Sequence, residues 1–330
     1  QFGGSPIAIA VSSDGTYLAA LAEAASSGAV TLWNISTPTP TRVWLRPVAI
    51  ERPKLLVLSR DAKQIAVGGG NAIDLLDASD GSCVRRLTGP ADIVAMIFGR
   101  DARLAWSDDQ AVHLVHLGAA KVGAPSAADC GKLATDGTPL TFESLAIKGV
   151  GEVAFDSRGN LLLAVVDGQQ FGVLRTARNA AGALEGGEPL PLECEGERSI
   201  SLGASRYSTT VSQVACAFAI DDKSGKVVPD DDFERPSSRR DSVIRDVVWS
   251  RVGVSNIKVL GDGELKVSGP KLGNRWTTHL KGVDFVSDST LNEELALSTN
   301  GLRLAALGRN GATVTVYNLE PRPFLAELVK

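Results

Sequence analysis

A short polar turn recurs along this chain, each time between two apolar stretches. Its first copy reads SSDG at residues 12–15. The copies begin at Ser12, Ser59, Gly99, Asp156 and Ser298. The first three intervals are 47, 40 and 57 residues, and the fourth, 142 residues, is close to three times the first. We therefore predict two weaker copies inside the long gap, with turns near Ser208 and Ser250, and seven units in all.

The apolar stretches beside these turns are typical of β-strands. They are short, rich in branched residues and bounded by Gly, Asp, Asn and Ser, whereas helical periodicity is scarce. The first unit has four of them, PIAIAVS, YLAALAE, AVTLWNI and TRVWLRPVAI, starting at residues 6, 17, 29 and 41. The second stretch is apolar throughout rather than alternating, which indicates a strand covered on both faces. The sequence therefore predicts an all-β protein.

A period in the forties with four strands per unit is the pattern of a propeller blade. One four-stranded sheet cannot cover both of its own faces, but sheets stacked radially cover one another. We predict a seven-bladed β-propeller of four-stranded antiparallel blades, forming a single domain over residues 1–330. Six or eight blades remain compatible with the same pattern. The chain starts at a first strand and ends with a fourth, PFLAELV at 323–329. We therefore expect the end blades to meet without exchanging strands, unless flanking sequence supplies a lock.

The turns and the ends of the third strands resemble those of WD-repeat propellers. The turns of S-x-D-G type begin at Ser12, Ser59 and Ser298. The pairs that stand where the family has Trp-Asp are Trp33–Asn34, Leu76–Asp77 and Tyr317–Asn318. The Gly-His pair that usually precedes the first strand of a WD repeat is absent, so the family's His-Ser-Trp-Asp hydrogen-bond network is not carried over. TolB-like and YVTN-type propellers share the same turn and stay open as alternatives.

The charge and hydropathy of the chain argue against two classes of partner. The formal net charge is −4 and the pI is about 5.5, whereas a nucleic-acid-binding protein usually carries a basic face. No apolar stretch approaches the roughly 18 residues that cross a bilayer. We therefore expect neither a nucleic acid nor a membrane as partner. We expect a cytoplasmic location, with the periplasm or secretion as alternatives.

The four cysteines, Cys83, Cys130, Cys194 and Cys216, are far apart in the sequence. Four cysteines allow three disulfide pairings, but a fold of this size has no need of covalent staples. We therefore expect four free thiols.

Groups that perform catalysis or bind metals are scarce in this sequence. The chain has three histidines, and none is next to a cysteine or a cluster of carboxylates. His113 and His116 lie three residues apart in a predicted strand, so they point to opposite faces and cannot chelate one ion. The glycines at 68–70 end a strand and indicate backbone crowding or a bulge. We expect no catalytic residue, no metal and no cofactor.

Two sets of side chains are candidates for binding a partner. Arginine and tryptophan are favoured in binding hot spots, and the predicted outer strands carry several of each. These residues are Arg42, Trp44, Arg46, Arg85, Arg86, Arg275 and Trp276. The polar segment at 227–242 adds Asp231, Arg239 and Arg240. The alternative for the outer strands is that long side chains cover the blade edges and prevent edge-to-edge pairing.

We expect a non-catalytic interaction domain that presents its loops and rim to a protein partner or to another domain of the same polypeptide. Because the chain begins with Gln1 rather than methionine, we expect it to be part of a larger protein. The first alternative is an enzyme, a hydrolase or lyase, that uses polar groups around the central channel. The shortage of histidines argues against it. The second alternative is a periplasmic TolB-like component.

Overall fold

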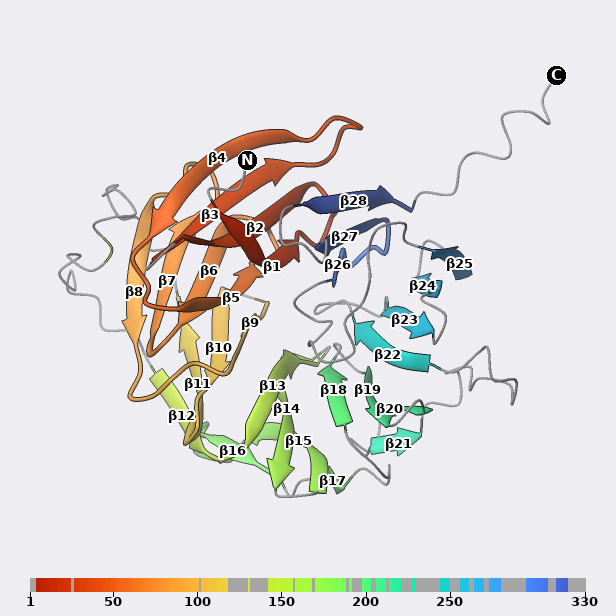
Figure 1. Ribbon diagram of the computed structural model, residues 1–330. Coiled ribbons are helices and arrows are strands. Elements are labelled where there is room, and N and C mark those ends of the chain that lie inside the picture. The colour runs from red at the N-terminus through yellow and green to blue at the C-terminus, as the bar shows by residue number, and fades with distance from the viewer. Residues whose placement is uncertain are drawn as a thin grey trace.

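Small sheets are arranged radially around a common axis in the computed structural model of the protein (Figure 1). The structure describes residues 4–24, 27–100, 102–117, 130, 142–156, 158–167, 170–187, 190–191, 198–202, 206–211, 214–220, 227–229, 244–249, 256–260, 264–269, 273–279, 295–307 and 313–319. These residues form seven antiparallel sheets, which we call blades 1 to 7 in chain order.

The strands of each blade are consecutive in the chain and hydrogen-bonded in that order. Blade 1 contains β1 (Ser5–Val11), β2 (Tyr17–Ala24), β3 (Ser27–Asn34) and β4 (Thr41–Val48). Blade 2 contains β5 (Pro53–Leu58), β6 (Gln64–Gly69), β7 (Ala72–Asp77) and β8 (Cys83–Thr88). Blade 3 contains β9 (Ala95–Phe98), β10 (Arg103–Ser107), β11 (Ala111–His116) and β12 (Phe142–Ala146).

The remaining blades follow the same order around the ring. Blade 4 contains β13 (Val150–Phe155), β14 (Leu161–Asp167), β15 (Gln170–Arg178), β16 (Leu184–Gly186) and β17 (Leu190–Pro191). Blade 5 contains β18 (Arg198–Leu202), β19 (Arg206–Val211), β20 (Val214–Ile220) and β21 (Val227–Pro229). Blade 6 contains β22 (Ile244–Trp249), β23 (Asn256–Leu260), β24 (Glu264–Gly269) and β25 (Gly273–His279). Blade 7 contains β26 (Leu295–Leu297), β27 (Arg303–Leu307) and β28 (Val314–Asn318). The prediction of an all-β chain built from small antiparallel sheets is confirmed.

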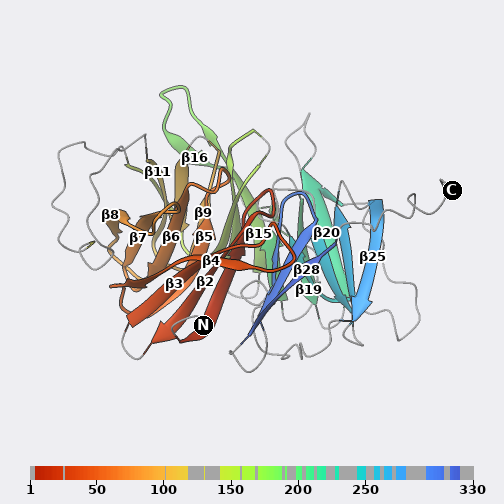
Figure 2. The same ribbon diagram turned by 90° about the horizontal axis from the view of Figure 1, so that it is seen from above.

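The hydrophobic core lies between neighbouring blades, which stand side by side in Figure 2. Leu32 of blade 1 shares a core cluster with Leu56 and Ile65 of blade 2. The second strand of a blade is the most deeply covered, as residues 19–22 of β2 are all 0% exposed. A strand buried on both faces has no polar side to show to water, which explains why these stretches are apolar throughout.

The recurring polar turn joins the first and second strands of a blade. In blade 1 the Ser12 hydroxyl donates to Asp14 Oδ1 at 2.6 Å and accepts from the Tyr17 N–H at 2.9 Å. The Gly15 N–H donates to the Ser12 carbonyl at 2.9 Å, and Gly15 has a φ of 76°, a conformation that favours glycine. The turn is therefore closed by its own groups.

The same hydrogen-bonded turn recurs in other blades. In blade 2 the Ser59 hydroxyl donates to Asp61 at 2.8 Å, and in blade 7 the Ser298 hydroxyl donates to Asn300 at 2.7 Å. In blade 4 an aspartate, Asp156, takes the place of the serine, and its carboxylate accepts from a backbone N–H at 2.8 Å. The repeat in the sequence is thus a repeat of one local structure.

The ring closes where blade 1 meets blade 7 (Figure 1). Strand β1 pairs with β2 in its own sheet and packs beside β26 and β27 without joining theirs. The Asn300 side-chain amide donates to the Asp14 carbonyl at 2.9 Å, which ties two equivalent turns together. Within the described residues the end blades therefore meet without exchanging strands, as predicted. The predicted last strand at 323–329 lies outside those residues.

One predicted turn is wrong. Ser208 lies inside β19, paired with Ser201 and Ala217, so the first hairpin of blade 5 closes before Arg206. The aromatic and β-branched residues around this serine favour a continuous strand, which a single serine does not interrupt.

Within the described part of the chain, no helix is long and apolar enough to span a membrane.

The glycines at 68–70 end β6 at a crowded point, as predicted. A Cβ on Gly69 would lie 2.4 Å from the carbonyl oxygen of Arg52 and 2.6 Å from the Cα of Pro53. The pairing of β5 with β6 is irregular at the same place, between Pro53 and Leu55. Gly68 differs, because a Cβ there would meet only side-chain atoms, the nearest at 3.4 Å.

We expect Gly69→Ala to lower the free energy of unfolding by about 2 kcal/mol, because the added methyl group pushes two backbone segments apart. Gly68→Ala, one residue earlier in the same strand, is the matched control and should cost less than half as much. Urea denaturation followed by fluorescence measures both values. Equal losses in the two variants would contradict this account of residue 69.

The cysteines differ from the expectation of four free thiols. Cys83, the first residue of β8, and Cys130 form a disulfide, with Cα atoms 5.4 Å apart. Both are 1% exposed and belong to the core cluster between blades 1 and 2. The expectation is wrong for this pair because the fold returns Cys130 to blade 2 after 47 residues, a contact that no short sequence motif announces.

We expect this disulfide to raise the melting temperature. In the loop-closure model a bridge over 47 residues stabilises the fold by up to about 4 kcal/mol. A reducing agent should therefore lower the melting temperature of the wild type, measured by scanning calorimetry. The Cys83→Ser/Cys130→Ser double variant should melt at a lower temperature and should not respond to the reductant. A wild-type transition that the reductant leaves in place would contradict the pairing.

A candidate docking site between blades 2 and 3

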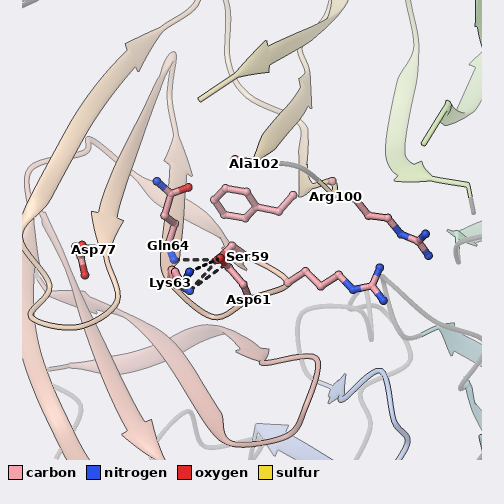
Figure 3. Close-up of a pocket in the computed structure, with 10 residues that line it drawn as sticks. Ser59, Asp61, Lys63, Gln64, Asp77, Arg100 and Ala102 are labelled. Atoms are coloured by element: carbon pink, nitrogen blue, oxygen red, sulfur yellow. Dashed lines mark hydrogen bonds and ion pairs between the residues drawn. The ribbon is translucent and has the colours of Figure 1, made fainter. Parts of the chain in front are cut away.

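A depression lies on the face of the ring that carries the turns between first and second strands (Figure 3). Its volume is about 810 Å³, and it is lined by residues of blades 2 and 3. The lining residues are Ser59, Arg60, Asp61, Lys63, Gln64, Asp77, Phe98, Gly99, Arg100 and Ala102. Most of them belong to two copies of the repeated turn, one after β5 and one after β9. The repeat therefore shapes the site as well as the fold.

The carboxylates of the depression are already engaged. Asp61 accepts from the Ser59 hydroxyl at 2.8 Å and from the Lys63 N–H at 3.2 Å, as the dashed lines of Figure 3 show. Burial alone would raise the pKa of Asp61, but these hydrogen bonds outweigh it and hold the pKa below its usual value. Asp77 accepts from the Ser79 N–H at 2.7 Å and from the Ser79 hydroxyl at 2.6 Å. Both acidic side chains thus serve their own turns.

The arginines of the depression are not engaged. Arg60 and Arg100 each follow the first residue of a turn, and both are exposed. Within the described residues, neither guanidinium has a hydrogen-bond or ion-pair partner. Figure 3 shows the Arg100 side chain extending toward the middle of the ring. Lys63 makes one exposed ion pair with Asp61, at 3.6 Å, which is worth little in water.

This arrangement suits an anionic ligand. A guanidinium presents its N–H groups in a planar fork that fits a carboxylate or a phosphate. The Phe98 ring, 3% exposed, adds an apolar part to the wall. None of the lining residues named above is a histidine or a cysteine, the usual ligands of transition metals. The depression is therefore equipped to bind an acidic group rather than to hold a metal.

Sequence reasoning did not single out Arg60 and Arg100, although a signal was present. Alignment of the turns places Ser13, Arg60 and Arg100 at one position, the second residue of the turn. In blades 1 and 2 the residues on both sides of this position bond to each other, so the residue between them is free to vary. Two arginines at a freely variable position are the signal that was missed.

Two of the predicted partner-binding residues connect blades 1 and 2. Trp44 is 7% exposed, and its indole N–H donates to the Ala78 carbonyl at 2.9 Å. Arg46 Nε donates to the Asp80 carbonyl at 3.1 Å. Both side chains cover Gly81, where a Cβ would lie 2.9 Å from the indole ring. These contacts place both side chains against residues 78–81 of the neighbouring blade, and partner binding by Trp44 and Arg46 stays a prediction.

Arg86 is paired within blade 2. Its Nε and Nη2 atoms donate to the two Asp74 carboxylate oxygens at 2.6 and 2.8 Å, and Asp74 is 0% exposed. The bond to Asp74 raises the pKa of Arg86 above its usual value. Asp74 also lies close to Cys83 and Cys130, with the three possible ligand atoms within 4.8 Å of one another. Because Arg86 occupies the carboxylate and the sulfurs bond to each other, this cluster offers no free set of metal ligands.

We expect Arg86→Met to lower the free energy of unfolding by about 3 kcal/mol, because it leaves the Asp74 carboxylate buried without its cation. Arg85→Met removes the same positive charge from the next residue and should change the value by less than about 1 kcal/mol. Guanidinium denaturation compares the two. If Arg85→Met were as damaging as Arg86→Met, the buried pair would not be the cause.

Three other predicted partner-binding residues, Arg42, Arg275 and Trp276, lie in the outer strands of blades 1 and 6. Arg42 is exposed on β4 and is not among the lining residues of the depression. Arg275 and Trp276 lie in β25, the outer strand of blade 6, as predicted. Asp231, Arg239 and Arg240 lie outside the described residues. Binding by all of these residues stays a prediction.

The two histidines of β11 have different surroundings, as expected for opposite faces of a strand. His116 is exposed, whereas the His113 ring contacts Asp108 and Ser144, each at 2.9 Å. Sequence reasoning missed this group because its members come from a turn, a third strand and an outer strand. Only the pairing of β11 with β12 places His113 opposite Ser144.

Comparison with known proteins settles the fold. No family model matches the chain, and no curated protein matches it in sequence. The Cps50 (Swd1) β-propeller domain of Myceliophteria thermophila matches it in structure with a TM-score of 0.57 at 13% identity, over 96% of each chain. The chain is a β-propeller. The prediction of a propeller fold, first indicated by the turns, is confirmed.

Other propellers of similar structure differ in what they do. Hsv2 of Kluyveromyces lactis matches with a TM-score of 0.59 at 14% identity, over 95% of this chain and 93% of that one. The periplasmic gluconolactonase PpgL of Pseudomonas aeruginosa matches with a TM-score of 0.55 at 14% identity, over 82% of this chain and 85% of that one. Because an enzyme is among these matches, the propeller fold leaves the function open.

Proposed function

We propose that this propeller is a docking domain with a non-catalytic site between blades 2 and 3, which binds an acidic segment of a protein partner or of another domain of the same polypeptide. The observation that carries the proposal is the pair of exposed arginines, Arg60 and Arg100, without partners in the described residues. The turn that carries Arg60 is closed by its own hydrogen bonds, so little order is lost there when a ligand binds.

The shape of the depression supports a peptide as the ligand. A volume of about 810 Å³ accommodates several side chains. The two exposed arginines fit a segment that carries aspartate or glutamate. The chain as a whole has a net charge of −4, so its average field repels an acidic partner and the local positive charge directs where that partner binds.

We expect the propeller to bind a fluorescein-labelled peptide of glutamates around one leucine, measured by fluorescence anisotropy at low salt. Arg60→Ala and Arg100→Ala should each raise the Kd about threefold to tenfold, since each removes charge-assisted hydrogen bonds at an exposed site. Raising the salt from about 50 to 200 mM should weaken binding in the wild type, because exposed charges are screened.

The matched control is Arg52→Ala, which removes an exposed arginine between β4 and β5 that does not line the depression. It should leave the Kd unchanged, and a lysine peptide of the same length should not bind. An equal loss of affinity in Arg52→Ala would show a response to net charge alone. That result, or no binding by the wild type, would overturn the proposed site.

The disulfide bears on where such docking takes place. Structural disulfides persist in oxidising compartments and are rare in the cytosol. The Cys83–Cys130 bridge therefore supports the periplasm or the exterior, the locations that the sequence left as alternatives to the cytoplasm. Alkylation of thiols in intact source cells, before lysis, would argue against this location if it modified Cys83 and Cys130.

A further inference from the structure

Three polar side chains form a hydrogen-bonded chain at the outer part of blade 3. His113, in β11, lies between Asp108 of the β10–β11 turn and Ser144 of β12. The distance from His113 Nε2 to Asp108 Oδ2 is 2.9 Å, and that from His113 Nδ1 to Ser144 Oγ is also 2.9 Å. A hydroxyl next to an imidazole that is in turn oriented by a carboxylate is the usual arrangement of an activated nucleophile.

The state of Asp108 determines which ring nitrogen carries the proton. Asp108 is 0% exposed. Burial alone would raise its pKa, but the N–H groups of Gln110 and Ala111 and the bond to His113 outweigh burial and lower the pKa. A charged carboxylate can only accept, so Nε2 of His113 carries the hydrogen. The lone pair on Nδ1 therefore accepts the hydrogen of the Ser144 hydroxyl.

The imidazole is held in place by its neighbours. The Trp106 ring stacks on it with centroids 5.1 Å apart and an angle of 25° between the planes. Only 13% of the His113 side chain is exposed. The indole N–H of Trp106 is buried and has no hydrogen-bond partner within the described residues. Blade 3 therefore holds a hydrogen-bond donor close to the imidazole that these residues do not use. Stacking and burial therefore hold the His113 imidazole in the orientation in which it faces Ser144.

Ser144 is accessible to a substrate. It is exposed, and β12 is the outermost strand of its sheet. The Ile147 N–H donates to the Gln110 carbonyl. Along an antiparallel strand, successive N–H groups point alternately toward the partner strand and away from it. Ser144 is three residues before Ile147, so its N–H points away from β11. Phe142, two residues earlier on the same face, is 52% exposed and offers an apolar surface. A reacting carbonyl beside Ser144 would thus find a hydroxyl, a backbone donor and an apolar contact.

We propose that Ser144 is a nucleophile activated by His113, with Asp108 as the positioning residue, and that it reacts with esters carrying an apolar acyl group. Ser144 Oγ forms a bond to the acyl carbon while its proton passes to His113 Nδ1. The bond to the alcohol oxygen breaks, and the leaving alcohol takes that proton. Water then forms a bond to the acyl carbon and gives a proton to His113 Nδ1. The bond between the acyl carbon and Ser144 Oγ breaks, Ser144 takes that proton from His113, and the carboxylic acid leaves.

This site is separate from the proposed docking site. Asp108 follows the end of β10, whereas the turn that carries Arg100 precedes the start of β10, so the two lie at opposite ends of that strand. Failure of either proposal leaves the other standing.

The experiment is labelling of the full chain with an alkyl fluorophosphonate, followed by intact-mass and peptide-mass analysis. In this reaction Ser144 Oγ bonds to phosphorus and fluoride leaves. We expect one adduct, at Ser144, and none in Ser144→Ala. Ser79→Ala is the matched control, because the exposed Ser79 hydroxyl bonds to a carboxylate at 2.6 Å without an imidazole. Its adduct should be the same as that of the wild type.

The rate of labelling tests the roles of the other two residues. Asp108→Asn should slow labelling about a hundredfold while Ser144 is unchanged. His113→Ala should slow it at least as much, and added imidazole should restore part of the rate, which a purely structural histidine would not allow. Thermal melts confirm that each variant is folded. An adduct at another serine, equal rates in wild type and Asp108→Asn, or no imidazole rescue would overturn the proposal.

Discussion

Each sheet of this ring depends on its neighbours to cover it. The residues at 19–22 of β2 are fully buried, which one isolated four-stranded sheet could not achieve. The favourable free energy of burial, about 25 cal/mol per Å², is therefore gained between neighbouring blades. The bond from Asn300 to the Asp14 carbonyl lies where the first and last blades meet. Closure of the ring thus adds one more interface, which covers the outer faces of blades 1 and 7.

The repeated turn divides structural positions from variable ones. Ser59 and Asp61 bond to each other and to the backbone, so both side chains serve the turn. The residue between them, Arg60, contributes nothing to the turn and faces outward. A propeller can therefore alter the chemistry of its face at one position per blade while its frame stays intact. Arg60 and Arg100 use that freedom in two adjacent blades.

The features that the sequence predicted are those set by local periodicity. Strand positions, the Ser12 turn and the crowding at Gly69 follow from residues that are close in the chain. The Cys83–Cys130 bridge does not, because its partners are 47 residues apart and lie in different strands or loops. The same holds for His113, because only the register of β11 and β12 places it opposite Ser144. Long-range pairs require coordinates because many registers satisfy the same apolar pattern.

Burial of carboxylates explains how an acidic chain presents a basic depression. Within the described residues, the buried aspartates are Asp74, Asp108 and Asp156, and they bond to Arg86, His113 and Arg175 respectively. The exposed aspartates of the turns are bound to neighbouring hydroxyl and N–H groups. These carboxylates are therefore fixed inside blades and turns, where hydrogen bonds satisfy their charge. The second position of the turn is left to define the local field, and in blades 2 and 3 that position is an arginine. The net charge of −4 thus predicts the average field of the surface but not the field at the site.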